Sequence, residues 1–280
     1  MRLFKYFHQD RRSFLSDRLI RFTQPGAFND PYEMQPFINS GHLARDLEAL
    51  YHENEDHILS SVYDKLPLEV RSKLTFSTAK QIFKSNEGVL IKEINKGAST
   101  FATKGNEHFF QSKADKYIGV LCLTEKPDNL LMWAHYANNH EGFVVEFDCD
   151  NSFFQQGLGE DIMCASLSKV VYSQNVPTTS LLDMKNFDFI LTKSDDWSYE
   201  QEWRMLLQQK DCVKNIPAEP HDTCLFEIPV ESIKRVILGC RADSELIQSA
   251  KKNLIGNNIE LAQANIVRSH FGLEIRQVKF

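Results

Sequence analysis

Apolar residues recur with two different periods along this chain of 280 residues, and the change of period constrains the fold more than any other feature. Near the start, and again from about residue 117 onward, short runs are apolar throughout or alternate apolar with polar residues, as β-strands do. Between about residue 40 and residue 112, apolar residues recur at three- and four-residue steps, as in amphipathic helices. The sequence therefore predicts strands on both sides of a helical block.

The strand-like runs are numerous, and most are short and end at turn-forming residues. They cover residues 2–7, 19–25, 117–124, 142–148, 169–173, 200–207, 224–229, 235–239 and 273–280. Further helices are expected at 128–142, 243–254 and 259–270. Many strands with helices gathered between some of them predict an α+β fold with mixed, mainly antiparallel sheets. We expect a single domain, residues 1–280, that carries residues 41–112 as a helical insertion.

The net charge of the chain and the spacing of its cysteines argue against several classes of protein. The formal net charge of −6 argues against a general nucleic-acid binder, because such proteins carry a basic surplus. The six cysteines form no C-x-x-C pair, which argues against a zinc ribbon or a disulfide scaffold and favours a reduced, cytoplasmic protein. No apolar run reaches about 18 residues, so we expect no membrane-spanning helix.

The segment KSDDWSYEQEWRMLLQQ, residues 193–209, holds two glutamates one residue apart. On a strand, Glu200, Glu202 and Arg204 share one face, and the two carboxylates lie about 6.5–7 Å apart. One interpretation is a solvated edge with a salt bridge, which contributes little stability. The second interpretation is a catalytic pair, in which one carboxylate stabilises an oxocarbenium-like sugar cation while its neighbour orients or deprotonates an acceptor.

The segment AFNDPYEM, residues 27–34, predicts a helix start. Asp30 at the N-cap, Pro31 at the first helical position and Glu33 two residues later form a capping box. This structural interpretation needs no function. A helix N-terminus also offers free N–H groups to an anion, and Asn29 or Asp30 could hold a ribose hydroxyl.

The segment NLLMWAHYANNHEG, residues 129–142, predicts a helix with Asp128 as its N-cap and Gly142 as its end. Beside the packing stripe of Trp133, His135 and Tyr136 form a suitable wall for a flat ring. His135 and His140 lie about 140° apart on a helix, whereas helical metal ligands prefer a spacing of four residues. We therefore predict no metal site here.

Four short motifs in these segments resemble an uncharacterised bacterial family, domain-of-unknown-function family 2971. They are Lys5-Tyr6, F-N-D-P-x-E at 28–33, M-W-x-H-Y-x-x-x-H-x-G at 132–142 and W-x-Y-E-x-E-W-R at 197–204. The resemblance spans nearly the whole chain apart from residues 41–112. It implies membership of the family, but the family name implies no activity.

The order of elements is also similar to that of ADP-ribosyltransferases, which release nicotinamide from NAD and transfer ADP-ribose. This resemblance implies an ADP-ribosyltransferase-like fold and NAD as a nucleotide substrate, with a role in bacterial defence or stress. It assigns Glu202 to the ribose cation and Glu200 to the incoming nucleophile, with Arg204 beside them. The residues that it places around the nucleotide are Lys5, Tyr6, Asn29, Asp30, Thr124, His135 and Tyr136.

The sequence leaves two other classes of function open. One is a metal-dependent phosphodiesterase or nuclease that uses Asp30, Glu33, His135 and His140 around a divalent ion. The other is a non-enzymatic sensor or partner-binding module whose helical block provides the docking surface. The acceptor of a transferase, whether protein, nucleic acid, small molecule or water, and the oligomeric state also stay open.

Overall fold

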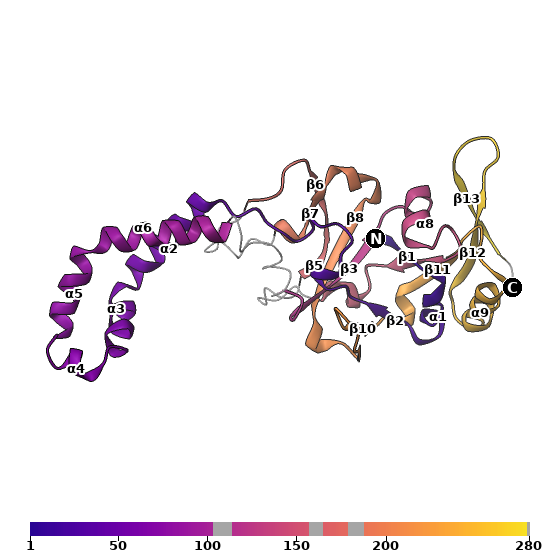
Figure 1. The fold of residues 1–280 in the computed structure, drawn as a ribbon. Coiled ribbons are helices and arrows are strands. Elements are labelled where there is room, and N and C mark those ends of the chain that lie inside the picture. The colour runs from indigo at the N-terminus through magenta and orange to yellow at the C-terminus, as the bar shows by residue number, and fades with distance from the viewer. Residues whose placement is uncertain (103–113, 157–164, 179–187, 279–280) are drawn as a thin grey trace. The chain divides into compact units, whose positions relative to one another are not determined.

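A computed structural model describes residues 1–102, 114–156, 165–178 and 188–278 (Figure 1). The chain divides into two compact units. The first consists of Met1–Met34, Phe110–Asn175 and Ile190–Phe280, and the second consists of Gln35–Phe109 and Val176–Phe189. The first unit holds the strands of an α+β fold with mainly antiparallel pairing, which confirms the predicted fold class.

An eight-stranded sheet is the frame of the first unit, in the order β13-β12-β11-β4-β1-β3-β8-β5. All neighbours pair antiparallel except β11 and β12, which are parallel. The strands are β1 Arg2–Phe7, β3 Ile118–Thr124, β4 Phe143–Asp148, β5 Ala165–Lys169, β8 Glu202–Gln208, β11 Ile233–Leu238, β12 Glu260–Ile266 and β13 Leu273–Gln277.

Two smaller sheets complete the strands of this unit. They are β2 Leu19–Arg21 with β10 Thr223–Glu227 and β9 Lys214–Ile216, and the parallel pair β6 Val171–Ser173 and β7 Thr192–Ser194. The helices of this unit are α1 Phe14–Asp17, α8 Leu130–Tyr136 and α9 Ser244–Leu254.

The large sheet is apolar on both faces, because helices cover each of them. Along β4, Val145 packs into a cluster that includes α1 and α9, whereas Val144 packs into a second cluster that includes α8. Successive side chains of a strand point to opposite faces, so α8 lies on the face opposite α1 and α9. Neighbouring strands are joined through backbone hydrogen bonds, so the positions of their side chains are fixed with respect to one another.

The helix predicted at 259–270 is wrong, because this segment contains β12. Its alanine-rich sequence, ELAQANI, suits a helix locally. In the folded chain it pairs in parallel with β11, with Arg235 opposite Glu260, and this pairing buries Leu261, Ala262 and Ala264. Tertiary pairing and burial thus outweigh the local helix preference.

The second unit contains the helical block, and its predicted helical pattern is observed at Ser40–Thr100. The helices are α2 Ser40–Glu53, α3 Glu55–Asp64, α4 Leu68–Arg71, α5 Phe76–Ser85 and α6 Glu87–Thr100. Asn39 and Thr75 cap α2 and α5 with their side-chain oxygens. Residues 103–112 of the predicted block lie outside the described residues. None of the described helices is both long and apolar enough to cross a membrane.

Candidate functional site

The strands β1 and β3 diverge, and the candidate site lies where they separate. They pair at one position only, Phe4 with Thr124. Farther along β3, Val120 exchanges two 2.9 Å backbone hydrogen bonds with Thr23 instead. The carbonyl of Cys122, between these positions, accepts a hydrogen bond from the Lys5 ammonium at 3.1 Å. The lysine therefore fills a gap that the backbone ladder leaves.

A cavity of about 380 Å³ opens over this divergence, a size that suits a small organic ligand or one part of a larger one. It is lined by Phe4, Lys5, Tyr6, Thr23, Ala27, Phe28, Asn29, Cys122, Leu123, Thr124, Met132, His135, Tyr136, Lys193, Glu200 and Glu202. Eight of the residues that the sequence predicted for the site thus lie around one cavity: Lys5, Tyr6, Asn29, Thr124, His135, Tyr136, Glu200 and Glu202. Arg204 and Asp30 do not line it.

The capping box predicted around Asp30 is wrong, because residues 29–34 form turns rather than a helix start. The Asp30 carboxylate accepts the N–H of Tyr32 at 2.9 Å, which is a local turn rather than an N-cap. Met34 then adopts a left-handed conformation, with φ of 57°, which ends any helical continuation. The turn leaves Asn29 at the cavity wall and Glu33 buried at 1% exposure.

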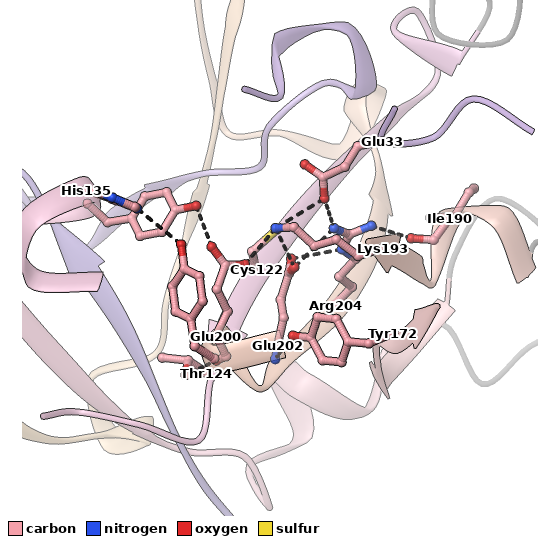
Figure 2. A network of polar contacts seen from close by, with 12 residues as sticks. Glu33, Cys122, Thr124, His135, Tyr172, Ile190, Lys193, Glu200, Glu202 and Arg204 are labelled. Carbon is pink, nitrogen blue, oxygen red and sulfur yellow. Dashed lines mark hydrogen bonds and ion pairs between the residues drawn. The ribbon is translucent and has the colours of Figure 1, made fainter. Parts of the chain in front are cut away.

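Glu200 is not on the strand, which corrects the predicted start of the strand at residue 200. It ends the 3-10 helix Asp195–Glu200, and Gln201 follows in a left-handed conformation with φ of 45°. Thr124 helps to hold this turn, because its hydroxyl donates a hydrogen bond to the Glu200 carbonyl. Although the shared strand face is lost, Glu200 and Glu202 both still line the cavity (Figure 2).

Of the two interpretations of this segment, the solvated edge is wrong, because Glu202 and Arg204 are buried, at 4% and 0% exposure. Arg204 Nε donates to Glu202 Oε1 at 2.8 Å, and Nη2 donates to Oε2 at 3.1 Å. The guanidinium also donates to a Glu33 carboxylate oxygen and, at 2.6 Å, to the Ile190 carbonyl. Arg204 therefore does not line the cavity but fixes the orientation of Glu202, to which it is hydrogen-bonded (Figure 2).

Lys193, on β7, is the central residue that the sequence did not reveal. Its ammonium lies 2.6 Å from Glu200 Oε2, 3.2 Å from Glu202 Oε2 and 3.4 Å from Glu33 Oε1. The ammonium also lies 4.9 Å from the centre of the Trp197 ring. No periodicity relates β7 to β8, because the 3-10 helix separates them. The only available signal was an isolated lysine just before an acidic segment, which is common on protein surfaces.

Opposing effects of burial and charge set the protonation of this cluster. Burial raises the pKa of Glu202, but the charges of Arg204 and Lys193 outweigh it and lower the pKa to about 2. Burial dominates at Glu33 and raises its pKa in spite of Arg204. Although burial opposes their charged forms, the surrounding carboxylates raise the pKa of both Lys193 and Arg204. Glu202 is therefore ionised at neutral pH, with two cations beside it.

The aromatic wall of the cavity comes from α8. The Asn129 side chain accepts the N–H groups of Leu131 and Met132, so Asn129 rather than the predicted Asp128 is the N-cap. The Tyr136 hydroxyl donates a hydrogen bond to Glu200 Oε1 at 2.5 Å. Burial together with the charge of Glu200 raises the pKa of the Tyr136 hydroxyl.

The rest of the predicted aromatic segment lies around this tyrosine. Trp133 is fully buried and donates to the Pro127 carbonyl at 2.9 Å. His135 is exposed, and its Nδ1 lies 3.2 Å from the Tyr199 hydroxyl. The helix ends at Tyr136, well before the predicted stop at Gly142, because Asn138, Asn139 and His140 have positive φ. Trp133 is therefore a core residue, whereas Tyr136 and His135 line the cavity.

Two further residues near Glu202 were not predicted for the site. The Tyr172 hydroxyl accepts the backbone N–H of Glu202 at 2.8 Å, and this contact helps to place the start of β8. Cys122 lines the cavity, and burial together with the charge of Glu202 raises the pKa of its thiol. A protonated thiol is a poor nucleophile, so Cys122 is part of the wall.

Two residues of the metal-dependent alternative make contacts with other parts of the protein. Glu33 pairs with Arg204 and Lys193, and the His140 ring stacks on Trp133 at 6.1 Å. Within the described parts of the chain, no group of three or more histidines, cysteines or acids is placed to hold a metal ion. The geometry of Asp30, Glu33, His135 and His140 therefore does not favour a divalent-ion site.

The segment from α8 through the acidic residues to β8 belongs to one sequence match with a known family. Residues 132–205 match DUF2971, a family of proteins of unknown function. This match supports the family predicted from the motifs. The DUF2971 match includes Tyr136, Lys193, Glu200, Glu202 and Arg204. No significant match was found among curated proteins or among solved structures. The resemblance to ADP-ribosyltransferases therefore stays a prediction.

Proposed function

We propose that this protein consumes NAD, as an ADP-ribosyltransferase or an NAD glycohydrolase. The observation that carries the proposal is the convergence of Glu200, Glu202 and Tyr136 on one cavity that residues of β1 and β3 also line. Three neighbouring strands thus supply a basic residue, a hydroxyl residue and a glutamate. These are Lys5, Thr124 and Glu202, in the chain order that the resemblance implies.

The geometry around Glu202 suits stabilisation of a sugar cation. Departure of nicotinamide leaves positive charge at C1′ of the ribose. A fixed, ionised carboxylate in a buried setting stabilises such a charge more strongly than water does. Arg204 and Lys193 hold both oxygens of Glu202, so the carboxylate needs little reorganisation during the reaction.

Glu200 is placed for a different role. One of its carboxylate oxygens accepts from Tyr136 and the other from Lys193. In the proposed reaction Glu200 orients the acceptor or takes its proton. The Tyr136 ring would stack on the nicotinamide, which carries a positive charge in NAD, and a cation beside an aromatic face is attracted to it.

The charges around the cavity also suit a cationic ring. Glu33, Glu200 and Glu202 outnumber the two cations that pair with them, Lys193 and Arg204. Lys5 also lines the cavity, and burial lowers its pKa. On the cavity wall itself, the two carboxylates of Glu200 and Glu202 lie beside one cation, Lys193, whereas Lys5 offers a donor to ribose or phosphate oxygens.

The decisive experiment measures nicotinamide release from NAD by chromatography. It is run with water alone and with candidate protein, nucleic-acid and small-molecule acceptors. We expect release by the wild type and a loss of about 100-fold or more in Glu202→Gln. Glu146→Gln is the matched control, because Glu146 is also a buried glutamate of this sheet but does not line the cavity. Unchanged NAD with every acceptor, together with no NAD-induced rise in Tm, would refute the proposal.

A further inference from the structure

The strand β13 leaves one side of its backbone open at an edge of the large sheet, at the yellow end of the chain in Figure 1. On its inner side, Val278 N–H donates to the Leu261 carbonyl at 2.8 Å, and Val267 N–H donates to the Gly272 carbonyl at 3.1 Å. Backbone groups alternate in direction along a strand. Glu274 and Arg276 therefore turn their backbone groups toward β12.

The intervening residues Leu273, Ile275 and Gln277 consequently turn their N–H and C=O groups outward. The order of the sheet ends at β13, and no strand of the described residues pairs with this outer side. Such a row of donors and acceptors is a template for another strand.

The two edges of the sheet differ in how they limit such pairing. At the opposite edge, the register of β5 shifts between Ala165 and Ser168, and the exposed Lys169 follows. Bulges and lysines are common protections of edge strands. By contrast, β13 pairs with β12 through five successive partners without a shift, and it contains neither proline nor lysine. The edge at β13 therefore keeps the regular geometry that strand addition needs.

The sequence of β13, LEIRQ, is complementary to itself in one antiparallel register. When Ile275 faces Ile275 of a second copy, Leu273 faces Gln277, and all three residues use their outward backbone groups. Glu274 then faces Arg276 twice, at the positions without mutual backbone hydrogen bonds, where cross-strand side chains lie closest. The backbone pattern and the charge pattern thus select the same register.

We propose that the edge of β13 is the interface of a homodimer, in which two copies pair antiparallel about a two-fold axis at Ile275. The sheet then continues from one copy into the other. Leu273 and Ile275 lie partly buried against the cluster beneath α8, so their partners in the second copy extend that apolar layer. Glu274 and Arg276 already form a 2.7 Å ion pair on the exposed face, and the dimer turns this pair into a ladder of alternating charges.

The test is the mass of the full chain in solution, measured by sedimentation velocity over a range of concentrations. The wild type should shift from 32.3 kDa toward twice that mass, with a Kd of about 10 µM, as expected for a small contact. Glu274→Arg alone and Arg276→Glu alone place like charges opposite each other, and each should weaken the dimer about tenfold or more.

Two charge exchanges distinguish this register from any other interface. The double variant Glu274→Arg/Arg276→Glu restores opposite charges and should dimerise like the wild type. An equimolar mixture of the two single variants should form a mixed dimer, because each chain supplies the charges that the other lacks. Arg268→Glu, an exposed charge reversal on the same hairpin, is the control that should leave the dimer unchanged. A monomeric wild type at about 100 µM, or a dimer that is indifferent to the single reversals, would overturn the proposal.

Discussion

Two buried glutamates of the same sheet carry arginine partners, yet their surroundings differ. Glu146, on β4, is 5% exposed and pairs at 3.0 Å with both Arg2 and Arg235. These arginines are 51% and 36% exposed, so they keep much of their hydration. Glu202 is buried to the same extent, but its partners Arg204 and Lys193 have side-chain exposures of only 0% and 4%.

An ion pair whose cations stay hydrated loses little solvation free energy on folding, whereas a fully buried ion pair loses much. A cation that stays in water loses little solvation when it pairs, whereas burying both partners carries a desolvation penalty that can exceed their attraction. The cluster at the cavity brings three carboxylates and two cations out of water. Such a cluster beside a cavity is more typical of a catalytic or binding site than of residues that stabilise the fold.

The largest expected effect is on folding. Lys193→Met removes a buried cation from among three carboxylates, so the free energy of unfolding should fall by about 3–5 kcal/mol. Arg235→Met, beside Glu146, should lower it by only about 1 kcal/mol or less. Urea unfolding of both variants measures the two changes. Equal losses would show that burial does not separate the two clusters.

The second effect is on acid stability. The pKa of Glu202 is lowered to about 2, so in acid the unfolded chain binds its proton before the folded chain does. The stabilisation from Glu202 is therefore complete above its ordinary pKa of about 4.3 and is lost as the pH falls toward 2. Glu202→Gln should flatten the stability curve in this window by on the order of 3 kcal/mol. Urea midpoints between pH 2 and 5 provide the measurement, and an unchanged slope would contradict the assigned charge of Glu202.

Glu33 should show the opposite and smaller dependence. Its pKa is raised by burial, so its contribution to stability is present below its ordinary pKa and is lost as the pH rises through the raised value. Glu33→Gln should remove this loss. The difference in unfolding free energy between variant and wild type should therefore change with pH above about 4.3. A difference that stays constant with pH would show that Glu33 ionises as an ordinary carboxyl group.

The smallest expected effect concerns the hydroxyl of Tyr136. Tyr136→Phe keeps the ring but removes the hydrogen bond to Glu200, so kcat/KM for nicotinamide release should fall about tenfold, with a loss of about 1 kcal/mol in stability. Tyr63→Phe is the matched control, because its hydroxyl donates to the Leu74 carbonyl in the helical unit. Its stability should fall by a similar amount while the release rate is kept. Equal rates in the two variants would remove Tyr136 from the proposed chemistry.

Local pattern found part of this site, and the family resemblances supplied Lys5, Tyr6 and Thr124. A period of two placed Glu202 and Arg204 on one face of a strand, and both now lie in one cluster. The mixed helical and strand patterns also predicted the α+β class correctly. Local pattern failed where the chain turns without a periodic signal, as at Gln201 and Met34, and where a neighbouring strand overrode helix preference, as in β12.

The sequence by itself determined which side chains could act together along one element, because the geometry of strands and helices repeats over a few residues. Only the tertiary structure decided that Glu33, 171 positions from Arg204, would share its guanidinium and that Lys193 would lie among three carboxylates. It also decided that the cluster would be buried. Burial and long-range pairing depend on which elements pack together, and this choice is made by the whole core rather than by any short segment.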